Sequence, residues 1–275
     1  MRRVLVFPVF VAGMLLRAPG ISAQSSAVLL QLRPRAGDTL RLRLDQSVEM
    51  AGAPSFGAGQ PTESSTLVVL TRLVVETSDA ESATLLAITD SVRLTSPPNS
   101  ASGTLLAWAK SIQGQRFRFR VATDGSALVG GKDTWSPQAG ALISQMPATL
   151  PRRPITPGTS WTRSMEIPLA GTLGVRGMAT LSATFRFDSL SKSGELAFIS
   201  VRGRLSRGAS EQKQGVTEVV ETSGTLTGEV LVDRRRGWIT DARTTMSLRS
   251  LVLPTSGDRP PVRVKLTISQ WMRAM

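Results

Sequence analysis

Apolar and polar residues alternate along much of this 275-residue chain. Leucines at positions 40, 42 and 44 alternate with Arg41 and Arg43, and the same period of two recurs in residues 116–121, 181–187 and 262–268. Successive side chains of a β-strand point to opposite faces, so this period predicts strands with one buried face and one solvent face. Such strands are typical of antiparallel sheets with one covered face.

Turn residues separate these segments and indicate the fold class. The pairs Asp124-Gly125, Ser193-Gly194 and Arg236-Gly237 each mark a tight turn between two apolar runs. Counting such runs gives about 11 to 13 strands. The chain is therefore predicted to be mainly β, folded as a large curved antiparallel sheet or a half-open barrel.

Two short helices are predicted in the middle of the chain. Apolar residues at positions 105, 108, 109 and 112 follow helical spacing, which predicts a helix at about 103–112. Ser136-Pro137 is a suitable helix start, and a second apolar stripe predicts a helix at about 137–146. Both helices are expected to pack against the apolar face of the sheet.

The order of turns and strands indicates an internal repeat. Residues 35–40 and 155–161 both enter a strand through a glycine turn. The hairpin around Asp124-Gly125 likewise matches the hairpin around Arg236-Gly237. Chance similarity is the alternative, because every hairpin consists of a short turn between two strands.

The predicted repeat divides a single β-rich domain over residues 24–275. Its halves span about 28–132 and 151–253. The spacing between matched positions is longer in the first half, and the additional residues fall in 51–64, a stretch rich in Gly, Pro, Ala and Ser. This stretch is predicted to be a loop, either a lid or an inert surface insertion.

The first residues have the three parts of a secretory signal peptide. Arg2 and Arg3 are followed by an apolar stretch over 4–16, and Ser22-Ala23 suits a signal peptidase. The stretch is shorter than the roughly 20 residues that a membrane-spanning helix needs, and no other run is long enough. Residues 1–23 are therefore predicted to be removed, which leaves a periplasmic or secreted protein without a transmembrane segment.

Three residue types are missing: the sequence contains no His, no Cys and no Tyr. Their absence excludes a Ser-His-Asp triad, a thiol nucleophile, a disulfide and the usual kinds of zinc site. No phosphate-binding loop, nucleophile elbow or calcium loop occurs either. We therefore predict no catalytic residue, no metal site and no cofactor; a hydrolase with two carboxylates brought together by folding is the remaining enzymatic alternative.

The chain is basic, with a formal net charge of +13. Removal of Arg2, Arg3 and Arg17 with the signal peptide leaves 13 − 3 = +10. This charge favours anionic partners such as phospholipid headgroups or envelope polysaccharide. Nucleic acid is not expected, because aromatic side chains that would stack on bases are sparse. An ordinary solvated surface, rich in arginine, is the alternative explanation.

One basic cluster is a candidate contact for an anionic surface. Arg234, Arg235 and Arg236 follow Asp233 in a predicted turn. A solvated hairpin tip is the alternative role for these three residues.

Parts of the sequence resemble two groups of exported bacterial proteins. The Leu-Pro…Gly-x-x-Trp pattern in residues 150–161, followed by strands around Asp233 and Gly237, resembles an uncharacterised class of secreted envelope proteins. The strand-Asp-turn-Gly-strand pattern with interposed helices is similar to the half-open barrels of lipoprotein-carrier (LolA-like) proteins. This similarity implies a concave apolar surface that holds acyl chains. It implies no particular ligand residue in this chain.

A binding or carrier role for a hydrophobic ligand or lipid is therefore the predicted function. Phe117, Phe119, Phe185 and Phe187 lie on the apolar faces of predicted strands and are the candidate lining of the site. A structural or assembly factor of the envelope, with a filled core and no ligand, is the main alternative. An outer-membrane barrel is a further alternative, although the sequence lacks the aromatic content expected for two interfacial girdles.

Signal cleavage provides a first testable prediction. The exported protein is expected to begin at Gln24, or within a few residues of it, because the signal-peptidase site precedes this residue. Intact-mass measurement of protein recovered from the envelope fraction checks the prediction. A mass that retains Met1 and the apolar stretch would contradict it.

Overall fold

The structure is a computed structural model that describes residues 27–52, 63–96, 110–128, 150–168, 178–206, 218–254 and 262–275. The predicted signal peptide and most of the predicted loop at 51–64 lie outside these residues. The strands are β1 (Thr39–Ala51), β2 (Glu63–Ser78), β3 (Ser82–Thr95), β4 (Arg116–Ala122), β5 (Ala127–Leu128), β6 (Ser160–Pro168), β7 (Met178–Leu190), β8 (Leu196–Ser206), β9 (Glu218–Asp233), β10 (Trp238–Pro254) and β11 (Val262–Ala274).

In the described residues these strands form one antiparallel sheet in the order β5-β4-β3-β2-β1-β11-β10-β9-β8-β7-β6. Strands β1 to β5 form a meander that runs from the centre to one edge, and β6 to β11 form a second meander that returns from the other edge. The two meanders meet where β1 pairs with β11, over ten residue pairs from Leu42↔Ala274 to Ala51↔Lys265. The predicted mainly β fold is confirmed, and the strands form one open antiparallel sheet.

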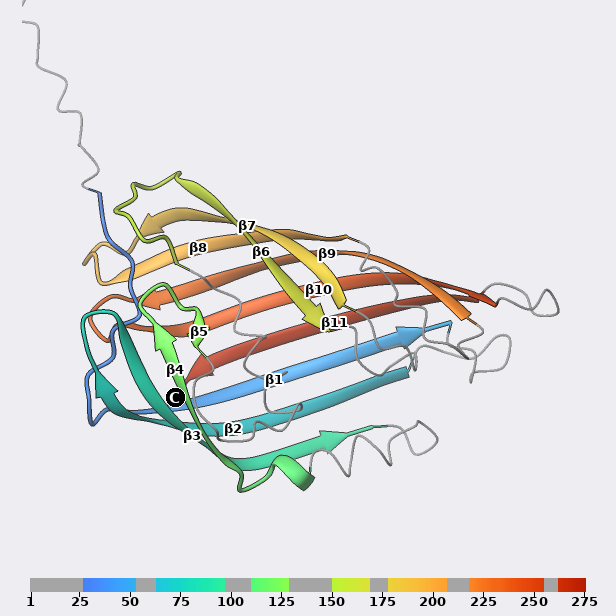
Figure 1. Cartoon of the computed structure of the whole chain (residues 1–275), viewed down its shortest axis with the longest axis horizontal. Coiled ribbons are helices and arrows are strands. Elements are labelled where there is room, and N and C mark those ends of the chain that lie inside the picture. The colour runs from blue at the N-terminus through green and yellow to red at the C-terminus, as the bar shows by residue number, and fades with distance from the viewer. Residues whose placement is uncertain are drawn as a thin grey trace, which may run out of the picture.

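The buried apolar side chains gather on one face of the sheet. A single core cluster combines residues from β1 to β4 with residues from β7 to β10, which lie on opposite sides of the central strands. The sheet must therefore curve so that both flanks reach the same core. Figure 1 shows this curvature, with β6 and β7 crossing over the central strands. We call the buried side the concave face and the opposite side the convex face.

The alternation of apolar residues predicted the strand faces. Leu42 and Phe119 are buried in the core cluster, and Leu40 and Phe117 pack against it. Leu44 is half-buried and shares the face of Leu42, because side chains two residues apart in a strand point the same way. The prediction that these side chains point to one common inner side is confirmed.

The two predicted helices are not confirmed. Residues 110–112 form a helical turn at the end of the first predicted segment, while 103–109 lie outside the described residues. The second segment, 137–146, lies wholly outside them. Within the described ranges, no helix combines the length and the apolar character needed to cross a membrane.

Two glycine turns share one hydrogen-bond pattern, although the predicted internal repeat is not confirmed. The turn at Gly37 donates to the carbonyl of Val75, and the amide of Val75 donates back to the next residue of the turn. The turn at Gly158 makes the same exchange with Phe187. Both glycines have φ close to +90°. The two strand entries are thus alike in geometry, and duplication of the halves stays a prediction.

The connections differ between the two ends of the sheet. At one end, which we call the turn end, β2–β3, β4–β5, β7–β8 and β9–β10 are joined by three to five residues. At the opposite loop end, the five other connections between successive strands of a meander have seven to twenty residues. The turn end lies at the left of Figure 1.

An extended segment before β1 crosses the turn end. We call residues 28–33 the strap. Its Leu30 and Leu32 are buried in the core cluster, together with Leu150 and Ile155 from the segment that precedes β6. The strap therefore closes the turn end of the core with apolar side chains.

Backbone hydrogen bonds fix the path of the strap. The amide of Leu32 donates to the carbonyl of Thr123 in the β4–β5 turn, and the amide of Arg33 donates to the carbonyl of Gly237 in the β9–β10 turn, both at 2.8 Å. These turns belong to different meanders. The strap thus ties the two halves of the sheet together at the turn end.

Replacing Gly237 with alanine is expected to destabilise the protein more than replacing Gly37. Both glycines have positive φ, 62° and 89°, so each alanine carries left-handed strain of about 1–2 kcal/mol. At Gly237 the added Cβ would also overlap the backbone of Arg33, whereas at Gly37 nothing lies within 4 Å. Urea unfolding should show that Gly237→Ala lowers the free energy of unfolding by about 1–3 kcal/mol more than Gly37→Ala does, which is the usual cost of overpacking. Equal losses of stability in the two variants would mean that the strap does not pack closely enough against this turn to exclude a Cβ.

Candidate ligand-binding face

The concave face consists of buried flanks and a half-buried centre. Inward side chains of β2, β3, β7 and β8 are mostly buried, whereas those of the central strands β1 and β11 are mostly half-buried. We call the inward side chains of β1 and β11 the floor. By register, the floor consists of Leu40, Leu42, Leu44, Gln46, Val48 and Met50 on β1, and Val264, Leu266, Ile268, Gln270, Met272 and Ala274 on β11.

The four phenylalanines predicted as a lining lie in the flanks. Phe119 is 2% exposed, and Phe185 and Phe187 are 0% exposed. Phe117 is half-buried, with its ring centroid 5.7 Å from that of Phe119. Phe185 stacks on Trp161 at 5.7 Å. Three of the rings are therefore packed core, and ligand contact by these four side chains stays a prediction.

The floor is apolar except for its two glutamines. Its half-buried apolar side chains are Leu40, Leu44, Val48, Met50, Leu266, Ile268, Met272 and Ala274. Apolar area that remains in contact with water forgoes about 25 cal/mol per Å² of stabilisation. The floor is therefore the part of the concave face where an apolar ligand would gain most by covering it.

Three polar side chains form a row across the centre of the concave face. Gln46 on β1 lies opposite Gln270 on β11, which lies opposite Thr244 on β10. Gln270 Nε2 donates to Gln46 Oε1 at 3.2 Å, and the Thr244 hydroxyl donates to Gln270 Oε1 at 3.4 Å. A few polar groups in an apolar concavity are what fixes the orientation of a ligand. We call these three residues the polar row.

The inward polar residues do not stand out in the sequence by type, although their positions in the alternation identify them. Gln46 and Gln270 each stand at a position where the alternation would place an apolar residue. The inward residues two positions away on both sides of each glutamine are apolar. Arg163 occupies the same phase on edge strand β6, and its guanidinium donates to the carbonyl of Leu150 at 3.3 Å. An inward charge also protects an edge strand against pairing with another chain.

Arg234, Arg235 and Arg236 form the tip of the β9–β10 turn and are exposed. Asp233 Oδ1 accepts from the amides of Arg235 and Arg236, both at 2.9 Å. The Arg234 guanidinium donates to a carbonyl of the neighbouring β7–β8 turn. Arg235 lies 3.8 Å from Glu195 in the same turn. These contacts hold the tip against the neighbouring turn, and contact with an anionic surface stays a prediction.

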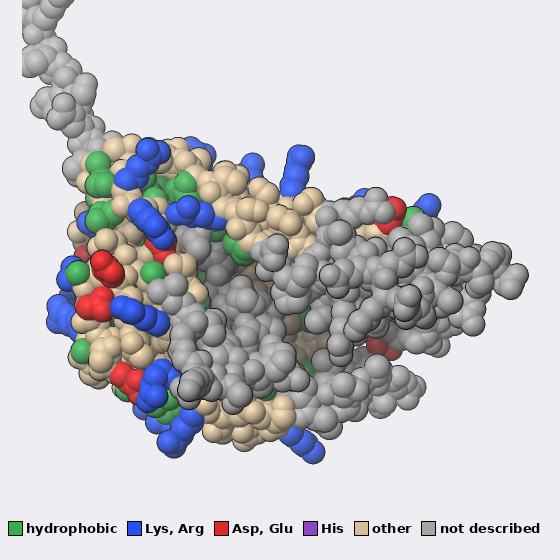
Figure 2. All heavy atoms as spheres, in the orientation of Figure 1, with side chains coloured by type: hydrophobic (Ala, Val, Ile, Leu, Met, Phe, Trp, Pro, Cys, Tyr) green, Lys and Arg blue, Asp and Glu red, His purple; other side chains and the backbone are tan. Residues whose placement is uncertain are grey.

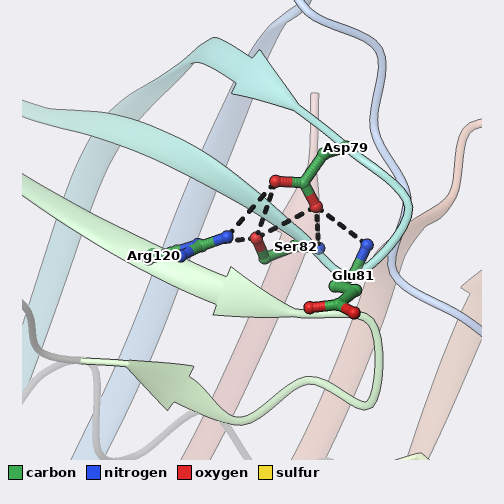
Figure 3. Close-up of polar contacts among 4 residues, drawn as sticks. All are labelled: Asp79, Glu81, Ser82 and Arg120. Atoms are coloured by element: carbon green, nitrogen blue, oxygen red, sulfur yellow. Dashed lines mark hydrogen bonds and ion pairs between the residues drawn. The ribbon is translucent and has the colours of Figure 1, made fainter.

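Asp79 organises the β2–β3 turn (Figure 3). Its Oδ1 accepts from the amides of Glu81 and Ser82, both at 2.8 Å, and its Oδ2 lies 3.2 Å from Arg120. The two backbone N–H groups hold the pKa of Asp79 below its usual value. A general base or acid works best with a pKa near the operating pH. The geometry therefore suits a turn-forming role rather than proton transfer.

Asp124 joins the β4–β5 turn to the segment before β6. Its Oδ1 accepts from the amide and hydroxyl of Ser126 at 3.0 and 2.6 Å, and its Oδ2 accepts from Arg152 at 2.8 Å. Burial raises the pKa of Asp124, but the hydrogen bonds from Ser126 and Arg152 together outweigh burial and lower it below the usual value. The folded state therefore favours the charged carboxylate.

Other candidate sites are less suited to an apolar ligand. A depression of about 390 Å³ is lined by Arg41, Leu70, Thr71, Arg72, Asp90 and Met275. It contains the ion pair between Arg72 and Asp90, at 2.8 Å. In the part of the chain that the structure describes, no group of acidic side chains is arranged to hold a metal ion.

Comparisons with known proteins give limited similarity. A protein-family model described as "Family of unknown function (DUF6263)" matches residues 140–239. The match extends from the segment before β6 to the start of β10 and covers less than half of the chain. No curated protein matches the chain.

Among the solved structures that match, one is aligned over most of its length. It is an outer membrane channel from Pseudomonas putida F1, 12% identical, and the match covers 94% of this chain and 99% of that chain. The TM-score is 0.20. A similarity at this level supports no conclusion about fold or function.

The hydrogen bonds of Asp124 predict a pH dependence of stability. The pKa of Asp124 is lowered on folding. The contribution of its carboxylate to the stability of the fold is therefore complete above the unfolded pKa of about 3.9, and it is lost as the pH falls through the lower pKa of the folded state. Asp124→Asn should cost about 1–2 kcal/mol at neutral pH. Urea unfolding between neutral pH and about pH 2 should show the two proteins converging in acid. A constant difference across this range would contradict the assignment.

Proposed function

We propose that this chain is an exported envelope protein that holds a hydrophobic ligand on the concave face of its sheet. The supporting observation is the floor, a set of half-buried apolar side chains between flanks that are already buried. Ligand sites are commonly apolar concavities with few polar groups. A ligand lying along the floor would remove from water the apolar area that stays partly exposed on these described strands.

An acyl chain suits this face better than a compact polar molecule. Each methylene buried contributes about 0.8 kcal/mol, so ten methylenes would contribute about 8 kcal/mol before the costs of association. The polar row would meet the ester or amide group of such a ligand, because side-chain amides and hydroxyls donate hydrogen bonds to carbonyl oxygens. The resemblance to lipoprotein carriers supports the same ligand class.

The proposal also includes the location of the protein and the side chains around the floor. The tripartite start of the sequence supports a periplasmic or secreted location. Of the four phenylalanines predicted as a lining, half-buried Phe117 would border the ligand, and Phe119, Phe185 and Phe187 would support the flanks from within the core. Arginines at the rim, such as Arg234 to Arg236, would meet an anionic headgroup.

A structural or assembly factor with a filled core is the second candidate function. The observation that favours it is complete burial of large rings, including Phe185 and Phe187, behind a strap that closes the turn end. A core packed in this way needs no ligand for stability. The two candidates differ in what covers the floor: a bound molecule in the first, and the chain's own residues in the second.

Substitution of one floor residue tests the ligand proposal. Ile268 points to the concave face, and Ser269 beside it points to the convex face. Ile268→Gln should weaken binding of a fluorescent fatty acid by about 10-fold or more, because a buried isoleucine contributes about 1.5–3 kcal/mol. Ser269→Gln, the matched control, should bind like the parent protein.

Native mass spectrometry of protein purified from its own envelope fraction provides the direct measurement. A co-purifying lipid that is lost with Ile268→Gln supports the carrier role. If no lipid co-purifies and fatty acids do not bind at micromolar concentrations, the filled-core factor is the better explanation.

A further inference from the structure

Many arginines near the turn end are paired with carboxylates. Arg43 lies 2.7 Å from Asp45, and Arg118 lies 2.6 Å from Glu76. Further ion pairs join Arg120 to Asp79, Arg152 to Asp124, Arg186 to Asp188, Arg235 to Glu195, Arg236 to Asp233 and Arg243 to Asp241. Figure 2 shows acidic and basic side chains intermingled at this end, on the left. Much of the positive charge of the turn end is therefore paired, whereas Arg33, Arg35, Arg41, Arg153 and Lys192 are exposed and have no ion pair among the described residues.

Toward the loop end, the convex face carries cations without such pairing. We call them the cationic face: Arg202 and Arg204 on β8, Arg249 on β10, and Arg263 and Lys265 on β11. All five are exposed. Among the described residues, none of their side chains takes part in a hydrogen bond or an ion pair. Their charge is therefore available to a partner outside the chain.

Hydroxyl side chains flank the two arginines of β8. Arg202 lies between Thr184 on β7 and Thr227 on β9 in the sheet register. Arg204 lies between Ser182 and Thr225 in the same way. Hydroxyl groups donate hydrogen bonds to phosphate and carboxylate oxygens, so the neighbours of these cations reinforce recognition of an anion.

Two cations of this face lie directly opposite one another. Arg249 on β10 pairs with Lys265 on β11 in the antiparallel register. Like charges at directly opposite positions destabilise a sheet. Near the turn end, the opposed pair Arg43 and Arg273 shares Asp45, at 2.7 and 3.8 Å. Since no carboxylate of the described chain bridges Arg249 and Lys265, an external anion would relieve their repulsion.

Acidic residues border the cationic face without neutralising it. Glu49 lies on β1 opposite Thr267, and Glu229 lies on β9 opposite Arg243. Glu221, also on β9, has an interaction of its own. No ion pair within the described residues joins these three glutamates to the five cations.

We propose that the cationic face docks on an anionic lipid bilayer. Its charges extend from β8 to β11, roughly 14 Å at the usual strand spacing of about 4.8 Å. Charges spread over this distance match the many phosphates of a bilayer surface better than one small anion, which needs donors that converge. The aromatic side chains on the convex side of β8 and β11, Phe198 and Trp271, lie toward the turn end rather than among the five cations, and this argues against stacking of single-stranded bases there. The proposal does not depend on a ligand at the floor.

Vesicle flotation with two matched triple variants tests the proposal. One variant carries Arg202→Gln, Arg204→Gln and Arg249→Gln, and the other carries Arg35→Gln, Arg153→Gln and Lys192→Gln, three exposed cations of the turn end. Both lose three positive charges. On phosphatidylcholine vesicles with about 30% phosphatidylglycerol, the first should bind on the order of 100-fold more weakly than the parent, because each basic residue near the surface contributes about fivefold.

The second variant should bind like the parent protein, and neither should bind pure phosphatidylcholine vesicles. Binding by the parent should weaken as salt rises, because salt screens exposed charges. Removal of Arg249 relieves a like-charge pair, so the first variant should unfold at the same urea concentration as the parent or higher.

Three results would overturn the docking proposal. The first is equal loss of binding in both variants, which would indicate net charge rather than this surface. The second is no binding, or equal binding to neutral and anionic vesicles. The third is binding to a soluble polyanion such as dextran sulfate but not to anionic vesicles, which would assign the face to a polysaccharide instead.

Discussion

The ladder between β1 and β11 is the interaction on which the rest of the structure depends. It joins the start of one meander to the end of the other, so that Gln46 and Gln270, 224 positions apart in the sequence, become neighbours. Without it, each meander would end in a long exposed edge. The floor and the polar row would also be lost, because each consists of residues from both strands. The candidate site is therefore a product of the most distant pairing in the sheet.

Much of the fold could be predicted from the sequence, because burial of one face imposes a period of two on each strand. This period predicted the inward side of Leu40 to Leu44 and of Phe117 and Phe119. It could not predict which strands are neighbours, because Val262 to Ile268 alternates like any other half-buried strand. The pairing of β11 with β1 depends on curvature and on long-range hydrogen bonds, which a single sequence does not display.

Less of the candidate site could be predicted. Phe119, Phe185 and Phe187 stood out by size and phase, yet large rings are what fills a packed flank. Whether Ile268 or Met272 is half-buried depends on the curvature of the sheet rather than on the residue. Whether a cation faces another cation also depends on register: the pairing of Arg249 with Lys265 follows from how β10 and β11 align, whereas the ion pair of Arg43 with Asp45 joins residues two positions apart in one strand.

The contrast between short turns and long connections sets an order for folding. The four turn-end hairpins need only three to five residues to close, and hairpins of this kind form within microseconds. Because Gln46 and Gln270 lie 224 positions apart, closing the β1–β11 ladder costs more chain entropy than closing a hairpin, and we expect the ladder to form later. An early folding intermediate would therefore hold two partial sheets whose central strands expose unpaired backbone groups. In a chain built this way, the strands that create the site would be the last to be protected from aggregation.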